Sequence, residues 1–260
     1  RSTSSRTTAE RNSSRHQCSS SANRPGPVTV RVAARPQPTR PSPRRTHEQA
    51  AVAAARAAYL AGFAGSSNLA AEQRYGVPTL GTSAHAFTLL HDDEEAAFRS
   101  QLETMGVGTT LLVDTYDVEK AVRLAVELAG PQLGAVRVDS GDLVDQAGRV
   151  RALLDSLGNR DTRITVTSDL DEYAIAALAA APVDSYGVGT RLVTGSGAPT
   201  SSMVYKLVAR QDDEGTWVDV AKASSGKASR GGRKEAARRR DRRGRATAEV
   251  VGVNRGVISD

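Results

Sequence analysis

Three aspartates stand where they could do chemistry. Asp114, Asp139 and Asp169 each close a short apolar run. An aspartate at such a place usually caps the next helix, but another aspartate follows each of these two or three residues later, in a better capping position. The first aspartate of each pair is therefore not needed as a helix cap. Three such residues at successive strand ends favour a polar site.

A histidine and an arginine extend this candidate site. His85 lies in the segment GTSAHAF, just past a short apolar run. Oriented by Asp114, it could act as a base or as a nucleophile toward phosphate; the alternative is a packed or capping histidine. Arg137 precedes Asp139 by two residues, so both side chains face the same side of a strand. The guanidinium of Arg137 is suited to bind a carboxylate or phosphate, and the carboxylate of Asp139 is suited to bind sugar hydroxyls. The alternative is a simple internal ion pair between the two.

A glycine-rich segment, YGVGTRLVTGSG at 186–197, follows the last apolar run. Gly187 and Gly189 would let backbone N–H groups approach an anion, and Thr190 adds a hydroxyl donor. The spacing matches neither a Walker loop nor a dinucleotide fingerprint, so an ordinary turn is the alternative.

Alternating strands and helices must position these residues. The pattern predicts a helix over 46–62, a short apolar run at 77–80 and a second helix from residue 91 to 106. Strands are then predicted at 110–114, 135–139, 164–169 and 184–189, with helices over 117–129, 142–157 and 171–180 between them. Such units build a parallel sheet, and both a closed β/α barrel and an open doubly wound sheet fit them. From Ser202 the pattern becomes that of a β-hairpin turning at DDEG.

The ends of the chain are basic and its body is acidic. Residues 1–43 hold eight arginines and one acid, and residues 222–245 hold eleven Lys or Arg and two acids, whereas residues 44–221 carry a net charge of −9. Residues 1–43 contain no Leu, Ile, Met or aromatic residue, which predicts a disordered leader. This leader has three interpretations: a basic arm that binds nucleic acid, a targeting peptide, or a segment without a role. The last of these includes a segment translated in a wrong frame.

Composition excludes several classes of protein. A single cysteine excludes a disulfide framework and any multi-cysteine zinc site. No apolar run is long enough for a membrane span, and the N-terminus lacks the apolar core of a secretory signal, so we expect a cytoplasmic protein without a membrane partner. Aromatic residues make up 4% of the chain, which argues against stacking on single-stranded nucleic acid.

Eight short segments in order resemble the nicotinate phosphoribosyltransferase family. The resemblance runs from about Arg44 to the C-terminus and rests on RRTHEQAAVAAARAAYLAGFAGSSN, YGVPTLGTSAHAF, LLVDTYD, VRVDSGDL, TVTSDLDE, DSYGVGTRLVTG, YKLV and KASSGKAS with GGRK. The resemblance implies an irregular α/β barrel with a smaller mostly-β part, working as a homodimer. It also implies an ATP-dependent ligase of NAD salvage, which joins nicotinate to phosphoribosyl pyrophosphate with Mg²⁺ as the pyrophosphate counterion.

The resemblance also implies roles for individual residues. His85 is similar to a histidine phosphorylated by ATP, Asp114 to the acid that orients it, and Arg137 and Asp139 to the base-side and ribose-side contacts. Substrate contacts are implied for Arg45, Ser67 and Asn68. Phosphate contacts are implied for Ser168, Asp169, Gly187, Gly189, Thr190, Lys206, Lys222 and Lys227.

The sequence also departs from the family. The family's N-terminal segment has no counterpart in residues 1–43, and the sequence predicts only about five of the eight strands of a barrel. We therefore expect an incomplete barrel. The chain then has three parts: a disordered basic leader (1–43), a partial barrel (44–200) and a C-terminal β-hairpin with a basic segment (201–260). We expect such a piece to be weakly active or inactive. The competing functions are a basic nucleic-acid-binding protein and another barrel enzyme acting on a sugar phosphate.

Overall fold

A parallel six-stranded sheet forms the centre of the computed structural model, which describes residues 28–30, 47–195, 198–200, 204–224 and 226–253. Along the sheet the strand order is β2-β1-β6-β5-β4-β3. The strands are β1 (Val28–Val30), β2 (Gly65–Ser66), β3 (Thr110–Leu112), β4 (Ala135–Val138), β5 (Arg163–Thr167) and β6 (Ser185–Val188). Beyond β2, Thr79 forms one further parallel bridge with Ser66.

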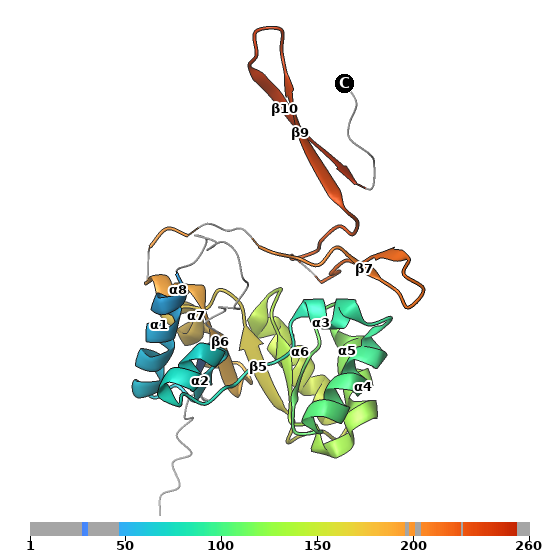
Figure 1. Cartoon of the computed structure of the whole chain (residues 1–260). Coiled ribbons are helices and arrows are strands. Elements are labelled where there is room, and N and C mark those ends of the chain that lie inside the picture. The colour runs from blue at the N-terminus through green and yellow to red at the C-terminus, as the bar shows by residue number, and fades with distance from the viewer. Residues whose placement is uncertain (1–27, 31–46, 196–197, 201–203, 225, 254–260) are drawn as a thin grey trace, which may run out of the picture.

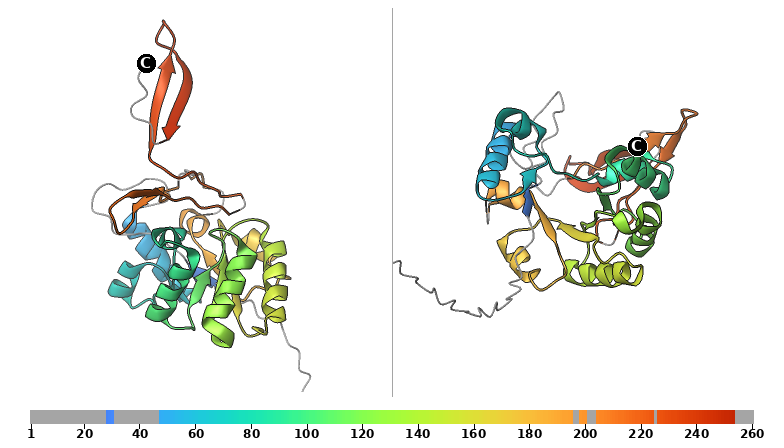
Figure 2. Two further views of the ribbon diagram at one scale, coloured as in Figure 1. Left: turned by 90° about the vertical axis from the view of Figure 1, so that its right-hand side faces the viewer. Right: turned by 90° about the horizontal axis from the view of Figure 1, so that it is seen from below.

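The sheet is curved, and helices cover its outer side (Figures 1 and 2). All its strands are short and pair in parallel; for example, Arg137 of β4 lies opposite Thr165 of β5. The helices are α1 (Glu48–Leu60), α2 (Leu69–Tyr75), α3 (His85–Leu90), α4 (Glu94–Met105), α5 (Val118–Ala129), α6 (Leu143–Ser156), α7 (Glu172–Ala177) and α8 (Thr190–Thr194), with a 3₁₀ turn at Gly130–Gln132. This arrangement confirms the predicted incomplete β/α barrel and argues against a doubly wound sheet, which would carry helices on both faces.

The two faces of each strand differ in polarity. Val136, Val138, Ile164 and Val166 point outward and are buried in the main apolar core against α5 and α6. The alternate residues are polar, because Arg137 is buried on the inner face and Thr165 there bonds the hydroxyl of Ser185 at 2.8 Å. The interior of the sheet is therefore built to hold polar groups, whereas the helix-covered face supplies the hydrophobic stabilisation.

Aspartate side chains cap four of the described helices: Asp93 caps α4, and three others cap the helices that follow β3, β4 and β5. Asp117, Asp142 and Asp171 are the N-caps of α5, α6 and α7, and each carboxylate accepts a backbone N–H of the first turn at 2.9–3.1 Å. These are the caps that the sequence predicts. The preceding aspartates are therefore released from capping, as the sequence argument requires.

Strand β1 differs from the sequence expectation. Val28–Val30 pairs with both β2 and β6, although it falls inside the leader predicted to be disordered. The run VTV is rich in β-branched residues, which favour a strand, but its arginine- and proline-rich surroundings hide that signal. The remainder of 1–43 lies outside the described residues.

Two antiparallel hairpins follow the barrel. The first joins β7 (Ala209–Gln211) to β8 (Trp217–Asp219) through the predicted turn at 212–215, in which Gly215 donates its N–H to the carbonyl of Asp212 at 3.0 Å. The second joins β9 (Lys234–Arg240) to β10 (Ala246–Val253) and projects away from the barrel (Figure 1). The sequence predicted a basic segment there but no hairpin, because an arginine-rich exposed strand lacks the usual apolar alternation. In the described part of the chain, no helix is long and apolar enough to cross a bilayer.

Candidate active site

The carboxyl ends of the parallel strands carry the polar cluster. Asp114 lies two residues beyond β3, Asp139 directly follows β4, and Ser168 directly follows β5. His85 opens α3, whose N-cap Ala84 offers no capping side chain. In a parallel sheet these ends share one rim, which is where ligands bind in β/α folds.

Asp114 is the most deeply buried member of the cluster, with none of its surface exposed. Its Oδ2 accepts hydrogen bonds from the N–H of Asp139 at 3.1 Å and from the hydroxyl of Ser140 at 2.5 Å. Its Oδ1 has no hydrogen-bond partner among the described residues. An unsatisfied buried carboxylate oxygen is costly, so Oδ1 is a natural place for a ligand contact.

His85 joins the rim to a lysine. Its Nε2 lies 2.7 Å from Nζ of Lys222, and its Nδ1 lies 3.1 Å from the hydroxyl of Thr115. Asp114 Oδ1 and Asp139 Oδ2 lie 3.6 and 3.5 Å from the same Nε2. Both carboxylates therefore face one ring nitrogen, while a hydroxyl contacts the other.

Arg137 and Asp139 form one hydrogen-bonded unit through Thr167. Nε of Arg137 donates to the Thr167 hydroxyl at 2.7 Å, and that hydroxyl donates to Asp139 Oδ1 at 2.6 Å. The Arg137 Nη2 atom lies 3.4 Å from the same carboxylate oxygen. The two side chains thus share a face of β4, as their spacing predicts. Nη1 of Arg137 is occupied by the hydroxyl of Thr82 and the carbonyl of Ser83.

The charges of the cluster are strongly coupled. Burial alone would raise the pKa of Asp139, but the contact with His85 at 3.5 Å, the charge of Arg137, the hydrogen bond from Thr167 and the charge of Lys227 hold that pKa well below its usual range. Burial lowers the pKa of Arg137, and the adjacent carboxylates of Asp139 and Asp114 oppose the shift. Asp139 is therefore a fixed negative charge at neutral pH.

A loop from the C-terminal part brings lysines to the rim. Burial lowers the pKa of Lys222, which is 4% exposed, while the charges of Asp114 and Asp139 oppose the shift. Nζ of Lys227 contacts the carbonyl of Asp139 and lies 3.2 Å from the Ser168 hydroxyl. Lys206 donates to the carbonyl of Lys227 at 2.9 Å and so supports the loop. Two cations thus come from the basic segment of the sequence.

The other predicted residues have different surroundings. Ser67 is half-buried, and Asn68 caps α2 by accepting the N–H of Ala71 at 3.1 Å. The Asn68 Nδ2 atom is buried without a partner among the described residues. Asp169 is exposed, and no hydrogen bond or ion pair among the described residues joins Ser67, Asn68 or Asp169 to His85 or its carboxylates.

The glycine-rich segment lies at the same end of the sheet. Gly187 pairs in register with Thr167, Gly189 precedes α8, and Thr190 is its first residue. The predicted substrate residue Arg45 lies outside the described residues. The structure therefore brings the catalytic candidates together with Lys222 and Lys227, and leaves the phosphate cradle as a prediction.

Three hydroxyl residues that contact the cluster, Thr115, Ser140 and Thr167, were missing from the sequence-based set. Thr115 and Ser140 directly follow Asp114 and Asp139, and Thr167 precedes Ser168. A hydroxyl beside each strand-end aspartate was the available signal. It was overlooked because hydroxyl side chains are common at the ends of strands and turns.

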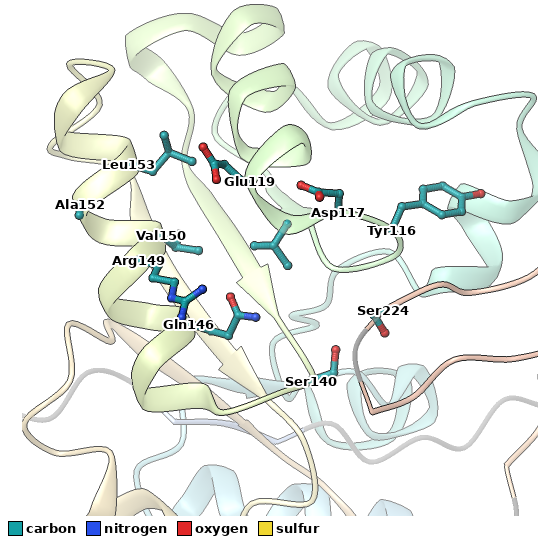
Figure 3. A pocket seen from close by; sticks show the side chains of 11 residues that line it. Tyr116, Asp117, Glu119, Ser140, Gln146, Arg149, Val150, Ala152, Leu153 and Ser224 are labelled. Carbon is teal, nitrogen blue, oxygen red and sulfur yellow. The ribbon is translucent and has the colours of Figure 1, made fainter.

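A groove of about 520 Å³ lies beside this cluster, between α5 and α6 (Figure 3). Ser140 and Ser224 stand at one end of it, and Gln146, Arg149 and Leu153 of α6 line its side. None of the sequence-predicted site residues lines the groove, although Ser140 links it to Asp114. Among the described residues, no group of three or more His, Cys, Asp or Glu could hold a metal ion.

Known proteins with similar sequences point to one family. Residues 42–250 match the nicotinate phosphoribosyltransferase (NAPRTase) family. Nicotinate phosphoribosyltransferase pncB1 of Mycobacterium tuberculosis is 62% identical over 216 residues, which cover 80% of this chain and 47% of that protein. The nicotinate phosphoribosyltransferase of Bacillus subtilis is 42% identical over 192 residues, covering 70% and 39%. The chain thus spans about half the length, or less, of the curated relatives it matches.

Solved structures share the fold. The nicotinate phosphoribosyltransferase of Porphyromonas gingivalis aligns with a TM-score of 0.64 at 20% identity, covering 78% of this chain and 56% of that one. The enzyme of Vibrio cholerae aligns with a TM-score of 0.60 at 18% identity, covering 79% and 52%. At these identities the likeness concerns the architecture of the barrel.

Proposed function

Because the chain belongs to the nicotinate phosphoribosyltransferase family, we propose that it carries the catalytic rim of such an enzyme. The reaction joins nicotinate to phosphoribosyl pyrophosphate, gives nicotinate mononucleotide and pyrophosphate, and is driven by hydrolysis of ATP in NAD salvage. The observation that carries this proposal is the contact of His85 with Lys222, with Asp114 and Asp139 facing the same nitrogen.

The cluster has charges suited to the transfer of a ribosyl group. The ring nitrogen of nicotinate forms a bond to the anomeric carbon of the ribose, while the bond from that carbon to pyrophosphate breaks and its electron pair leaves with the pyrophosphate. Positive charge develops on the ribose, where the ionised Asp139 would stabilise it. Lys227, 41% exposed in its side chain, is accessible to the leaving group.

Arg137 is suited to the pyridine carboxylate of nicotinate. Its Nε and Nη1 atoms are hydrogen-bonded to protein oxygens at 2.7–3.2 Å, whereas Nη2 has the longer contact of 3.4 Å with Asp139, so Nη2 is the nitrogen that would reach a substrate. A guanidinium fixed in this way presents its remaining donor without further loss of rotamer entropy. Arg45, Ser67 and Asn68 remain proposed substrate contacts, and the unpartnered Nδ2 of Asn68 supports that proposal.

His85 would accept the γ-phosphoryl group of ATP. A ring nitrogen forms a bond to phosphorus, the bond to the β-phosphate oxygen breaks, and ADP leaves with that electron pair. Lys222 is at hydrogen-bond distance from the ring and would neutralise the incoming phosphoryl oxygens. Ser168, Asp169, Gly187, Gly189 and Thr190 remain the proposed phosphoribosyl contacts, with Lys206 supporting the lysine loop.

Magnesium fits the rim as an ion shared with substrate oxygens. Mg²⁺ prefers one or two carboxylates together with substrate phosphates. The unpartnered Asp114 Oδ1 and the neighbouring Asp139 would hold it together with substrate phosphate oxygens. When bound, the ion would supply positive charge that binds and stabilises pyrophosphate.

The parts of the chain divide the work in this proposal. Residues 44–200 would bind and orient the substrates, with β1 (Val28–Val30) pairing into their sheet, and residues 201–260 would supply the lysines. A cytoplasmic location and a homodimer belong to the same proposal, and light scattering of the purified chain tests the dimer.

Labelling with γ-³²P-ATP tests the proposal. We expect acid-labile label on the parent chain and none on His85→Ala. His91→Ala is the matched control, because His91 is also half-buried on this segment and, within the described part of the chain, its ring hydrogen-bonds the carbonyl of Phe87 at 2.8 Å and no residue of the cluster. Equal labelling of His85→Ala would overturn the assignment. ATP hydrolysis that does not depend on nicotinate would favour another sugar-phosphate barrel enzyme.

A further inference from the structure

Thr115 is a buried threonine that contacts the ring of His85. It is fully buried, and its hydroxyl oxygen lies 3.1 Å from Nδ1 of His85. The same oxygen lies 3.5 Å from the hydroxyl of Thr88, a second buried threonine. Thr115 also holds the lysine loop, because its carbonyl accepts the N–H of Ala223 at 3.0 Å.

The contacts of His85 fit one arrangement of protons. A lysine ammonium has donors and no acceptor, so Lys222 at 2.7 Å requires a lone pair on Nε2. Nδ1 then carries the hydrogen and donates it to the hydroxyl oxygen of Thr115 at 3.1 Å. Asp114 and Asp139 would favour a hydrogen on Nε2, but at 3.5–3.6 Å they lie beyond good hydrogen-bond distance.

We propose that Thr115 is a positioning residue that holds His85 in the Nδ1–H form, so that Nε2 accepts the phosphoryl group. This inference rests on the proposed function, since it names the reacting atom of the same histidine. The Nε2 lone pair forms the bond to phosphorus, ADP leaves with the electron pair of the broken P–O bond, and the hydrogen stays on Nδ1. Lys222 moves from the lone pair to the phosphoryl oxygens.

The hydroxyl partner also affects how long the phosphoryl group stays. A carboxylate at Nδ1 would stabilise the positively charged phosphorylated ring, as aspartate stabilises the imidazolium of a serine-protease triad. A neutral threonine stabilises it less, and the two carboxylates on the Nε2 side repel phosphoryl oxygens. The arrangement thus favours a phosphohistidine that transfers or loses its phosphoryl group readily.

Three variants separate the positioning role from a structural one. Thr115→Val keeps the shape and removes the acceptor, and Thr115→Ser restores the hydroxyl. Thr88→Val is the matched control, because Thr88 is equally buried and contacts Thr115 through its hydroxyl without an observed bond to His85. The readouts are the phosphohistidine isomer after labelling with ATP, and the ¹⁵N NMR tautomer of His85 in the unlabelled chain.

We expect label on Nε2, and an Nδ1–H ring by NMR, in the parent chain, Thr115→Ser and Thr88→Val. Thr115→Val should label about tenfold more slowly, the factor expected for about one hydrogen bond, with part of the label on Nδ1. Label on Nδ1 in the parent, or unchanged rate and isomer in a folded Thr115→Val, would overturn the inference. If no chain is labelled, the proposed function fails, and the NMR tautomer still decides the role of Thr115.

Discussion

Replacement of Thr167 by valine should cost far more stability than the same change two residues earlier. Thr167 is 3% exposed, accepts from Arg137 at 2.7 Å and donates to Asp139 at 2.6 Å. Hydrogen bonds to charged groups contribute about 1.5–3 kcal/mol each. Because Asp139 keeps other partners, we expect the lower end, about 3 kcal/mol for the two bonds together.

Thr165→Val is the matched control for this change. Thr165 lies on the same face of β5, and its hydroxyl makes a neutral bond with Ser185 at 2.8 Å. Such a bond contributes about 1 kcal/mol. The two variants should therefore differ by about 2 kcal/mol, or about 1 M in the urea midpoint at an m-value of about 2 kcal/mol/M.

Urea unfolding followed by far-UV circular dichroism measures this difference, and Thr167→Ser should recover most of the loss. The difference in unfolding free energy between Thr167→Val and Thr165→Val should become smaller in acid. The folded-state pKa of Asp139 is lowered, so the stabilisation by its charged form is present above about pH 4 and is lost as the pH falls through the folded pKa. If Thr167→Val costs no more than Thr165→Val at neutral pH, the charge-assisted unit does not stabilise the fold.

Two further predictions concern parts of the fold outside this unit. Burial and the nearby charges of Asp117 and Asp114 raise the pKa of Glu94 to about 7, so folding stability should fall as the pH rises from about 4.5 through 7. Glu94→Gln removes that fall and should be about 1–2 kcal/mol more stable than the parent at pH 8, a value reduced for partial exposure, and equal near pH 4 by urea unfolding. Gly134→Ala would set a Cβ 2.0 Å from the Gly108 carbonyl oxygen and should cost about 1–3 kcal/mol or more, whereas Gly148→Ala in α6, with open space around its Cβ, should gain about 0.5–1 kcal/mol. The melting temperatures of the two glycine variants test this prediction. Similar changes in melting temperature for Gly134→Ala and Gly148→Ala would contradict the packing argument.

The sequence by itself determined the elements whose signals are local. Alternating apolar runs and helical patterns predicted the strands and helices around Asp114 and Asp139, and the paired aspartates predicted which residue caps and which remains available. Spacing alone placed Arg137 and Asp139 on one face. These features depend on residues within one helix turn or one strand, so they can be derived without tertiary contacts.

Only the tertiary structure decided which groups surround His85. Thr115 lies 30 residues from it and Lys222 lies 137 residues from it, yet both contact the ring. The sequence argument named Asp114 as the group that orients His85; the structure places Asp114 and Asp139 on the Nε2 side of the ring and adds the hydroxyl of Thr115 at Nδ1. The path of a loop and the rotation of a ring are set by packing among distant elements, and no local pattern records them.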